Sequence, residues 1–148
     1  MNMKQTTLIT IIMVALALTF TTCKHEEDGP KNQSATINPF EDYKVTVKGT
    51  FTDTEWKGSG ASSVAGKIEN AMKSHFEGAP DFGKDALRPR YAKCKIVFVE
   101  KTSDYNNWKT TGDGETICIN YNVLNTEDLK NSIIAALISM EASKTEQG

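Results

Sequence analysis

The sequence CKIVFV at residues 94–99 is the clearest strand-forming segment of the chain. It combines β-branched and aromatic side chains and is apolar on nearly both faces, the pattern of a strand in the middle of a sheet. Working outward, residues 43–47 alternate apolar and polar positions with a period of two, as a half-buried strand does. Residues 116–123 alternate in the same way. The sequence therefore predicts three strands with residues 94–99 at the centre.

Two amphipathic helices are predicted around these strands, because apolar residues recur at helical spacing. The first follows a cap at Ser62 or Ser63, and its apolar stripe consists of Val64, Ile68, Ala71, Met72 and Phe76. The second follows a cap at Asn125 or Thr126, and its stripe consists of Leu129, Ile133, Ala136, Leu137 and Met140. A stop at Gly78 and Pro80 ends the first helix. The residues from there to Lys93, and residues 100–115, are predicted to be polar connections.

The predicted order of elements is strand, helix, strand, strand, helix, which indicates an α+β fold. A right-handed crossover makes the first two strands parallel, and we expect the third strand to run antiparallel to the second. Both helices then cover one face of a small mixed three-stranded sheet, in a two-layer domain. We expect a single domain at residues 40–148, with a frayed C-terminal tail from Ser143 onward.

Residues 1–22 have the organisation of a secretory signal peptide. Lys4 is the only charge before the apolar run at residues 8–20, and small residues precede a charged segment that starts at Lys24. The run is shorter than the ~20 apolar residues that a membrane-spanning helix needs. The sequence therefore predicts export of the chain and cleavage close to Cys23.

The sequence Phe20-Thr21-Thr22-Cys23 resembles the lipobox of bacterial lipoproteins. The usual box has Leu, then Ala or Ser, then Gly or Ala before the Cys, so this chain departs from it at all three positions. Relaxed boxes of this kind are typical of spirochaete and Bacteroidetes lipoproteins. The resemblance implies that Cys23 carries a diacylglycerol and fatty acyl groups such as palmitate, and is the first residue of the mature chain. The alternative is an ordinary signal peptide cleaved near Thr22, with Cys23 left as a thiol.

With its relaxed lipobox and its mass of 16.3 kDa, the chain resembles the small outer-membrane lipoprotein antigens of intestinal spirochaetes. That resemblance implies a membrane-anchored protein without an assigned catalytic activity. Two or three acyl chains hold a protein firmly in a bilayer. We therefore expect an outer-membrane location, with the cell-surface and periplasmic faces both open. The expected partners are the membrane, through the N-terminal acyl groups, and a host or envelope protein.

Residues 23–39 are predicted to be the lipidated cysteine and a flexible tether. The sixteen residues after Cys23 include only two apolar side chains, too few to offset the entropy of ordering the segment. A coil of about sixteen residues spans roughly 20–25 Å. Such a tether lifts the folded domain clear of the lipid headgroups.

Composition and motifs argue against several functions. Without Lys4 and the rest of the signal, the chain has a formal net charge of −3, whereas nucleic-acid-binding domains are usually strongly basic. His25 and His75 are far apart in the sequence, and no zinc-ligand spacing, phosphate loop or dinucleotide fingerprint is present. We therefore expect no catalytic residue, no metal, no cofactor and no nucleic-acid partner, and we expect that the protein is not an enzyme.

Two polar segments contain candidate partner contacts. Five basic residues lie close together in the sequence at Lys84, Arg88, Arg90, Lys93 and Lys95. Tyr105 and Trp108 are aromatic residues in an otherwise polar connection, a composition found at binding surfaces. From these segments, Arg88, Arg90, Tyr105 and Trp108 are the candidate contact residues. The alternatives are a solvated basic loop and a pair of aromatic side chains that fold back as a lid on the core.

Cys94 and Cys118 are candidates for a disulfide, since the chain is predicted to be exported. If Ile96 and Phe98 face the helices, Cys94 has the same parity and Cys118 points to the other face, which excludes a bridge. If Val97 and Val99 are the buried pair instead, the conclusion is reversed.

The leading hypothesis for function is a surface antigen or a binding and interaction protein of unknown ligand. The alternative is a periplasm-facing component with a structural or assembly role in the envelope. An enzyme is the least favoured of the three classes.

Overall fold

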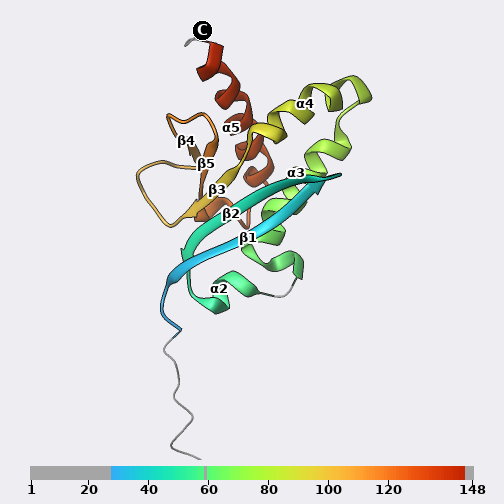
Figure 1. The fold of residues 1–148 in the computed structure, drawn as a ribbon. Helices are drawn as coiled ribbons and strands as arrows, with labels where there is room; N and C mark the ends of the chain where they lie inside the picture. The colour runs from blue at the N-terminus through green and yellow to red at the C-terminus, as the bar shows by residue number, and fades with distance from the viewer. Residues whose placement is uncertain (1–27, 59, 146–148) are drawn as a thin grey trace, which may run out of the picture.

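The computed structural model describes residues 28–58 and 60–145, which form a mixed five-stranded sheet packed against helices (Figure 1). The strands are β1 (Lys31–Phe40), β2 (Tyr43–Phe51), β3 (Ile96–Glu100), β4 (Trp108–Thr110) and β5 (Thr116–Asn120). The helices are α2 (Asp53–Lys57), α3 (Val64–Gly78), α4 (Asp81–Lys93) and α5 (Asp128–Thr145), with short 3-10 turns at Gly60–Ser62 and Tyr121–Val123. The predicted α+β class is confirmed. The prediction of three strands is not, because β1 and β4 add one strand at each edge.

The strand order is β1-β2-β3-β5-β4. β2 and β3 are parallel, as predicted. β3 and β5 are also parallel, so the predicted antiparallel pairing of these two strands is wrong. The reason is β4, which was expected to be part of a polar connection. β4 lies at the edge of the sheet and runs antiparallel to β5. Because the chain reverses direction once in β4 and again before β5, β5 runs parallel to β3 and lies between β3 and β4.

The prediction of a flexible tether is wrong for residues 31–39. These residues belong to β1, which pairs with β2 from Lys31↔Phe51 to Ile37↔Val45, so the domain begins well before Phe40. The prediction from composition failed here because it considers only how many apolar side chains a segment can bury. β1 buries few side chains, mainly Ile37 and Phe40, and much of its pairing is made by backbone hydrogen bonds, which any residue except Pro can donate.

The segment that was expected to be a polar loop up to Lys93 is helix α4. It buries only Leu87 and Tyr91, which lie one helical turn apart, and it contains Pro89 in its interior. A proline inside a helix removes one backbone hydrogen bond and normally predicts a break. The helix nevertheless has an acidic first turn and a basic last turn, which complement its dipole.

Helices α3 and α5 confirm the two predicted helices. Ser63 caps α3 by accepting a hydrogen bond from the Gly66 amide at 3.0 Å. The predicted stripe of α5 is entirely buried. The helix continues to Thr145, two residues beyond the predicted start of the frayed tail at Ser143, and residues 146–148 lie outside the described residues. Both stripes belong to one core cluster with the strand residues Val45, Val47, Phe51, Val97, Val99, Ile117 and Ile119. This places α3 and α5 on one face of the sheet, as expected.

No helix in the described part of the chain is long and apolar enough to cross a membrane.

Candidate functional site: a groove on the open face of the sheet

The face of the sheet opposite α3 and α5 is formed by the even-numbered residues of β2, β3 and β5. Over β5 this face is covered by the loop that follows β3. Asn120 anchors the loop, because its side-chain amide donates hydrogen bonds to the carbonyl oxygens of Thr102 and Tyr105 at 2.8 and 2.7 Å. Over β1, β2 and β3 the face remains open, and the sheet is hollowed there into a groove.

The groove has a volume of about 770 Å³ and is lined by residues 32–34, 48–50 and 98–101. These three segments come from neighbouring strands, and they meet at the end of the sheet where β1 begins and β2 and β3 finish. Sites for small molecules usually have volumes of 300–1,000 Å³. The groove is therefore large enough to hold a ligand of that size or a short stretch of a longer one.

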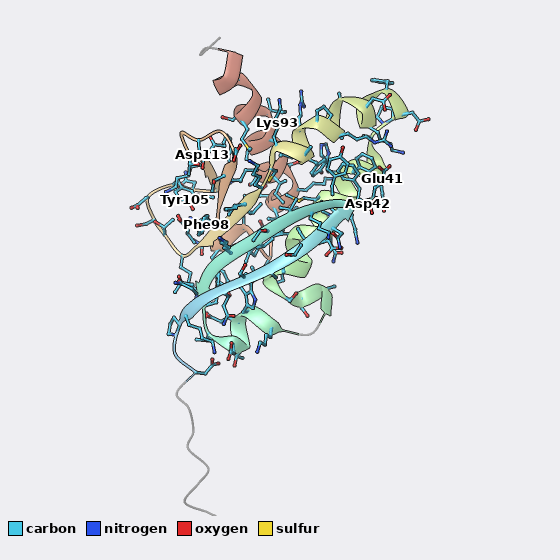
Figure 2. All side chains as sticks on the ribbon, viewed as in Figure 1. Glu41, Asp42, Lys93, Phe98, Tyr105 and Asp113 are labelled. Atoms are coloured by element: carbon cyan, nitrogen blue, oxygen red, sulfur yellow. The ribbon has the colours of Figure 1, made fainter. Side chains whose placement is uncertain are left out.

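The chemistry of the groove combines one aromatic surface, hydrogen-bonding groups and a free cation. Phe98 points to the open face and is half-buried (Figure 2). Asn32, Ser34 and Thr50 supply amide and hydroxyl groups at the groove. For the Lys48 ammonium, no hydrogen-bond or ion-pair partner is found among the described residues. Lys48 can therefore meet an anionic group of a ligand while Phe98 contacts its apolar part.

The two other charged residues of the groove are already neutralised. Glu100 accepts a hydrogen bond from the Tyr105 hydroxyl at 2.8 Å and lies 3.6 Å from the Lys109 ammonium. Burial, together with this contact to Glu100, raises the pKa of Tyr105, so Tyr105 stays protonated and donates. Lys101 forms an ion pair with Glu55. Lys48 is thus the charged residue of the groove lining for which no partner is found among the described residues.

The structure places Trp108 in β4 and Tyr105 in the loop between β3 and β4, and neither residue lines the groove. Tyr105 is half-buried over the open face, with Lys109 at 4.7 Å from its ring centroid. Trp108 is part of β4, opposite Ile119, and packs against the core. Trp108 therefore folds back on the core, as the alternative to partner binding required, whereas Tyr105 lies over the opposite face of the sheet beside Glu100 and Lys109.

Arg88 and Arg90 belong to α4, at the other end of the sheet. The Arg88 guanidinium lies 3.0 Å from Glu41 in the β1–β2 turn and 5.9 Å from the Phe76 ring centroid, so it ties the turn to the helices. Arg90 is half-buried near His75. Burial, with Lys130 and Arg90 as further causes, lowers the pKa of that histidine. The four predicted contact residues are therefore not brought together in one site.

Cys94 and Cys118 are both buried and free. Val97 and Val99 are the pair that faces the helices. This is the arrangement for which the sequence alone did not exclude a disulfide. The register excludes it, because Cys118 pairs with Phe98 while Cys94 precedes β3. The two cysteines are thus displaced by four residues, or ~13 Å, along the strands, whereas a disulfide needs Cα atoms within about 7 Å.

Both buried thiols are expected to be unreactive in the folded protein. Burial raises the pKa of Cys94 to about 12 and also raises the pKa of Cys118, so little thiolate, the reactive form, exists near neutral pH. In a Cys23→Ala variant, a thiol reagent should modify neither residue until guanidinium chloride unfolds the chain, and should then modify both. Fast labelling of either residue in the native protein would contradict the buried positions.

Within residues 28–58 and 60–145, no group of three or more His, Cys, Asp and Glu side chains is arranged to hold a metal ion. Cys23 and His25 lie outside the described residues, so the predicted lipidation stays a prediction.

Lys48 and Phe98, the main residues of the groove, were not found from the sequence. Both residues lie in or next to segments that were predicted to be strands. For β3, however, the sequence did not decide whether the even-numbered or the odd-numbered residues face the helices. Placing Val97 and Val99 inside would have put Phe98 outside. The groove itself depends on the register of three strands, of which β1 was not predicted.

No known protein family, curated protein or solved structure matches the chain.

Proposed function

We propose that the protein is a lipid-anchored outer-membrane lipoprotein whose folded domain binds a ligand in the groove over β1, β2 and β3. The observation that carries this proposal is the groove itself, whose lining includes Lys48 and the half-buried Phe98 at paired positions of β2 and β3. The groove favours binding over catalysis, because its lining includes no His or Cys and its carboxylate, Glu100, is already paired. The preferred ligand has an anionic group beside an apolar part.

The anchor is the second part of the proposal and rests on the lipobox resemblance at residues 20–23. Acylation of Cys23 with two or three chains supplies enough buried hydrocarbon for stable membrane attachment, whereas a single chain binds only marginally. The ligand is then a host or envelope component that reaches the domain at the membrane.

Mass spectrometry of the mature N-terminus tests the anchor. We expect the mature chain to begin with an acylated Cys23 and to partition into the detergent phase of a membrane extract. The Cys23→Ala variant should move to the aqueous phase. An unmodified N-terminus on a chain that still partitions with the membrane would contradict the lipoprotein assignment.

In-cell photocrosslinking tests the groove. A benzophenone amino acid at Ser34, an exposed residue of the groove, should give a discrete adduct that disappears in a Lys48→Glu background. The matched control is the same probe at Ser74, an exposed residue of α3 away from the groove. The mass of the adduct distinguishes a host partner from an envelope partner. An adduct pattern that is the same at Ser34 and Ser74 would reject the groove as the binding site.

A further inference from the structure

Asp28 is the first described residue, and it is held firmly on helix α2. Its carboxylate accepts hydrogen bonds from the Asp53 and Thr54 backbone amides at 2.7 and 3.1 Å, and from the Thr54 hydroxyl at 2.7 Å. These contacts lower the pKa of Asp28, so the carboxylate is ionised near neutral pH and matches the positive end of the helix. Asp28 is therefore part of the folded domain.

The chain between the proposed lipid and the domain is consequently short. Asp28 lies five residues after Cys23, and five fully extended residues span at most ~18 Å. The sixteen-residue tether predicted from composition would have allowed the domain to stand farther from the bilayer. With Asp28 fixed, the α2 end of the domain cannot move farther from Cys23 than this limit.

The α2 end of the domain is also the end where the groove lies. β1 begins three residues after Asp28, and Lys31 pairs with Phe51, the last residue of β2 before α2. Groove residues 32–34 and 48–50 belong to this end of the hairpin. The turn at Glu41 and Asp42 lies at the opposite end of β1, roughly 30 Å away at 3.3 Å per residue (Figures 1 and 2).

We propose that the α2 end of the domain rests on the phospholipid headgroups, so that the groove lies at the membrane surface. This inference rests on the proposed lipidation of Cys23. Lys57 of α2 lies 3.9 Å from Asp53 and has a side chain that is 74% exposed, so its ammonium can also contact lipid phosphates. A ligand of the groove is then a component of the membrane or a molecule held close to it.

Fluorescence quenching in vesicles tests this orientation with the full mature acylated protein. The vesicles consist of phosphatidylcholine with a nitroxide on part of the headgroups. A fluorophore is attached to Lys57→Cys in one variant and to Asp42→Cys in another, and the buried Cys94 and Cys118 stay unlabelled. We expect quenching at position 57 to exceed quenching at position 42 several-fold. Equal quenching at the two positions would overturn the inference.

Two further variants make the result specific to the short connection. About twenty Gly and Ser residues inserted between Glu27 and Asp28 lengthen it to a coil of roughly 25–30 Å, which should remove most of the difference between positions 57 and 42. A fluorophore at Phe82→Cys reports on the other end, since Phe82 is 81% exposed at the start of α4. Strong quenching at Phe82 would show that the domain lies on α4 and would overturn the inference.

The anchor and the orientation fail in different ways. Flotation with the vesicles and the mass of the N-terminus report whether Cys23 is acylated. A chain without acyl groups contradicts the proposed lipoprotein, whereas an acylated chain with equal quenching at both ends contradicts the membrane contact alone.

Discussion

Replacing Gly49 with alanine is expected to lower the free energy of unfolding by about 3 kcal/mol, at the upper end of the usual cost of overpacking. A Cβ atom at this position of β2 would lie 2.2 Å from Cε2 of Phe51 and 2.7 Å from the carbonyl oxygen of Val99. The Phe51 ring is fully buried, and the Val99 carbonyl belongs to the neighbouring strand. Neither group can withdraw without disturbing the sheet beneath the groove.

Urea denaturation in the Cys23→Ala background measures this effect. Gly112→Ala is the matched control, because no atom lies within 4 Å of a Cβ atom there, and its stability should change by less than about 0.5 kcal/mol. A Gly49→Ala, Phe51→Leu double variant removes the ring atom that clashes, so the two substitutions should couple by about 1 kcal/mol or more. Equal stability of Gly49→Ala and Gly112→Ala would contradict the packing described for β2.

Replacing Tyr91 with alanine is expected to cost about 3–5 kcal/mol, as for other large aromatic residues in a core. Tyr91 is 1% exposed, and its ring meets Phe40 edge-on with the centroids 5.1 Å apart. Its hydroxyl donates a hydrogen bond to the Met72 carbonyl oxygen at 2.9 Å, which joins α4 to α3. This one side chain therefore connects both helices to the end of β1.

The hydrogen bond and the ring can be measured separately by the same denaturation experiment. Tyr91→Phe keeps the ring and leaves the Met72 carbonyl without this partner, so we expect a loss of about 1–2 kcal/mol. Tyr43→Phe is the control, since Tyr43 stacks on Phe40 at 4.4 Å but no hydrogen bond of its hydroxyl is found among the described residues. If Tyr91→Phe and Tyr43→Phe have the same small effect, the contact between α4 and α3 is not formed.

The periodic helices and strands were found, although the third predicted strand ends at Asn120 and residues 121–123 form a 3-10 turn instead, and the elements without periodicity were missed. Ile133 and Leu137 of α5 are buried as their spacing indicated, because an amphipathic helix contains the whole pattern within one segment. β1 has no comparable pattern. Its pairing depends on β2, which lies beyond the turn at Glu41 and Asp42, and this partnership is invisible in the composition of residues 31–40.

The candidate site shows the same division. Lipidation of Cys23 could be predicted because a signal peptide and a lipobox are local sequence patterns, and it stays a prediction. The groove was not identified, because Lys48 and Phe98 are adjacent only through the parallel register of β2 and β3. Arg88 was a candidate partner contact, with a solvated loop as the alternative, and tertiary packing places it against Glu41 and Phe76.

The sequence by itself determined the α+β class, the two amphipathic helices and the parallel pairing of β2 with β3. These features follow from short-range periodicity, from the handedness of a crossover and from local motifs, which a linear chain contains completely. Only the tertiary structure decided the edge strands, helix α4, the separation of Cys94 from Cys118 and the groove. Those features depend on backbone pairing and register between segments that are far apart in the chain. The side chains of one segment do not specify which other segment its backbone pairs with.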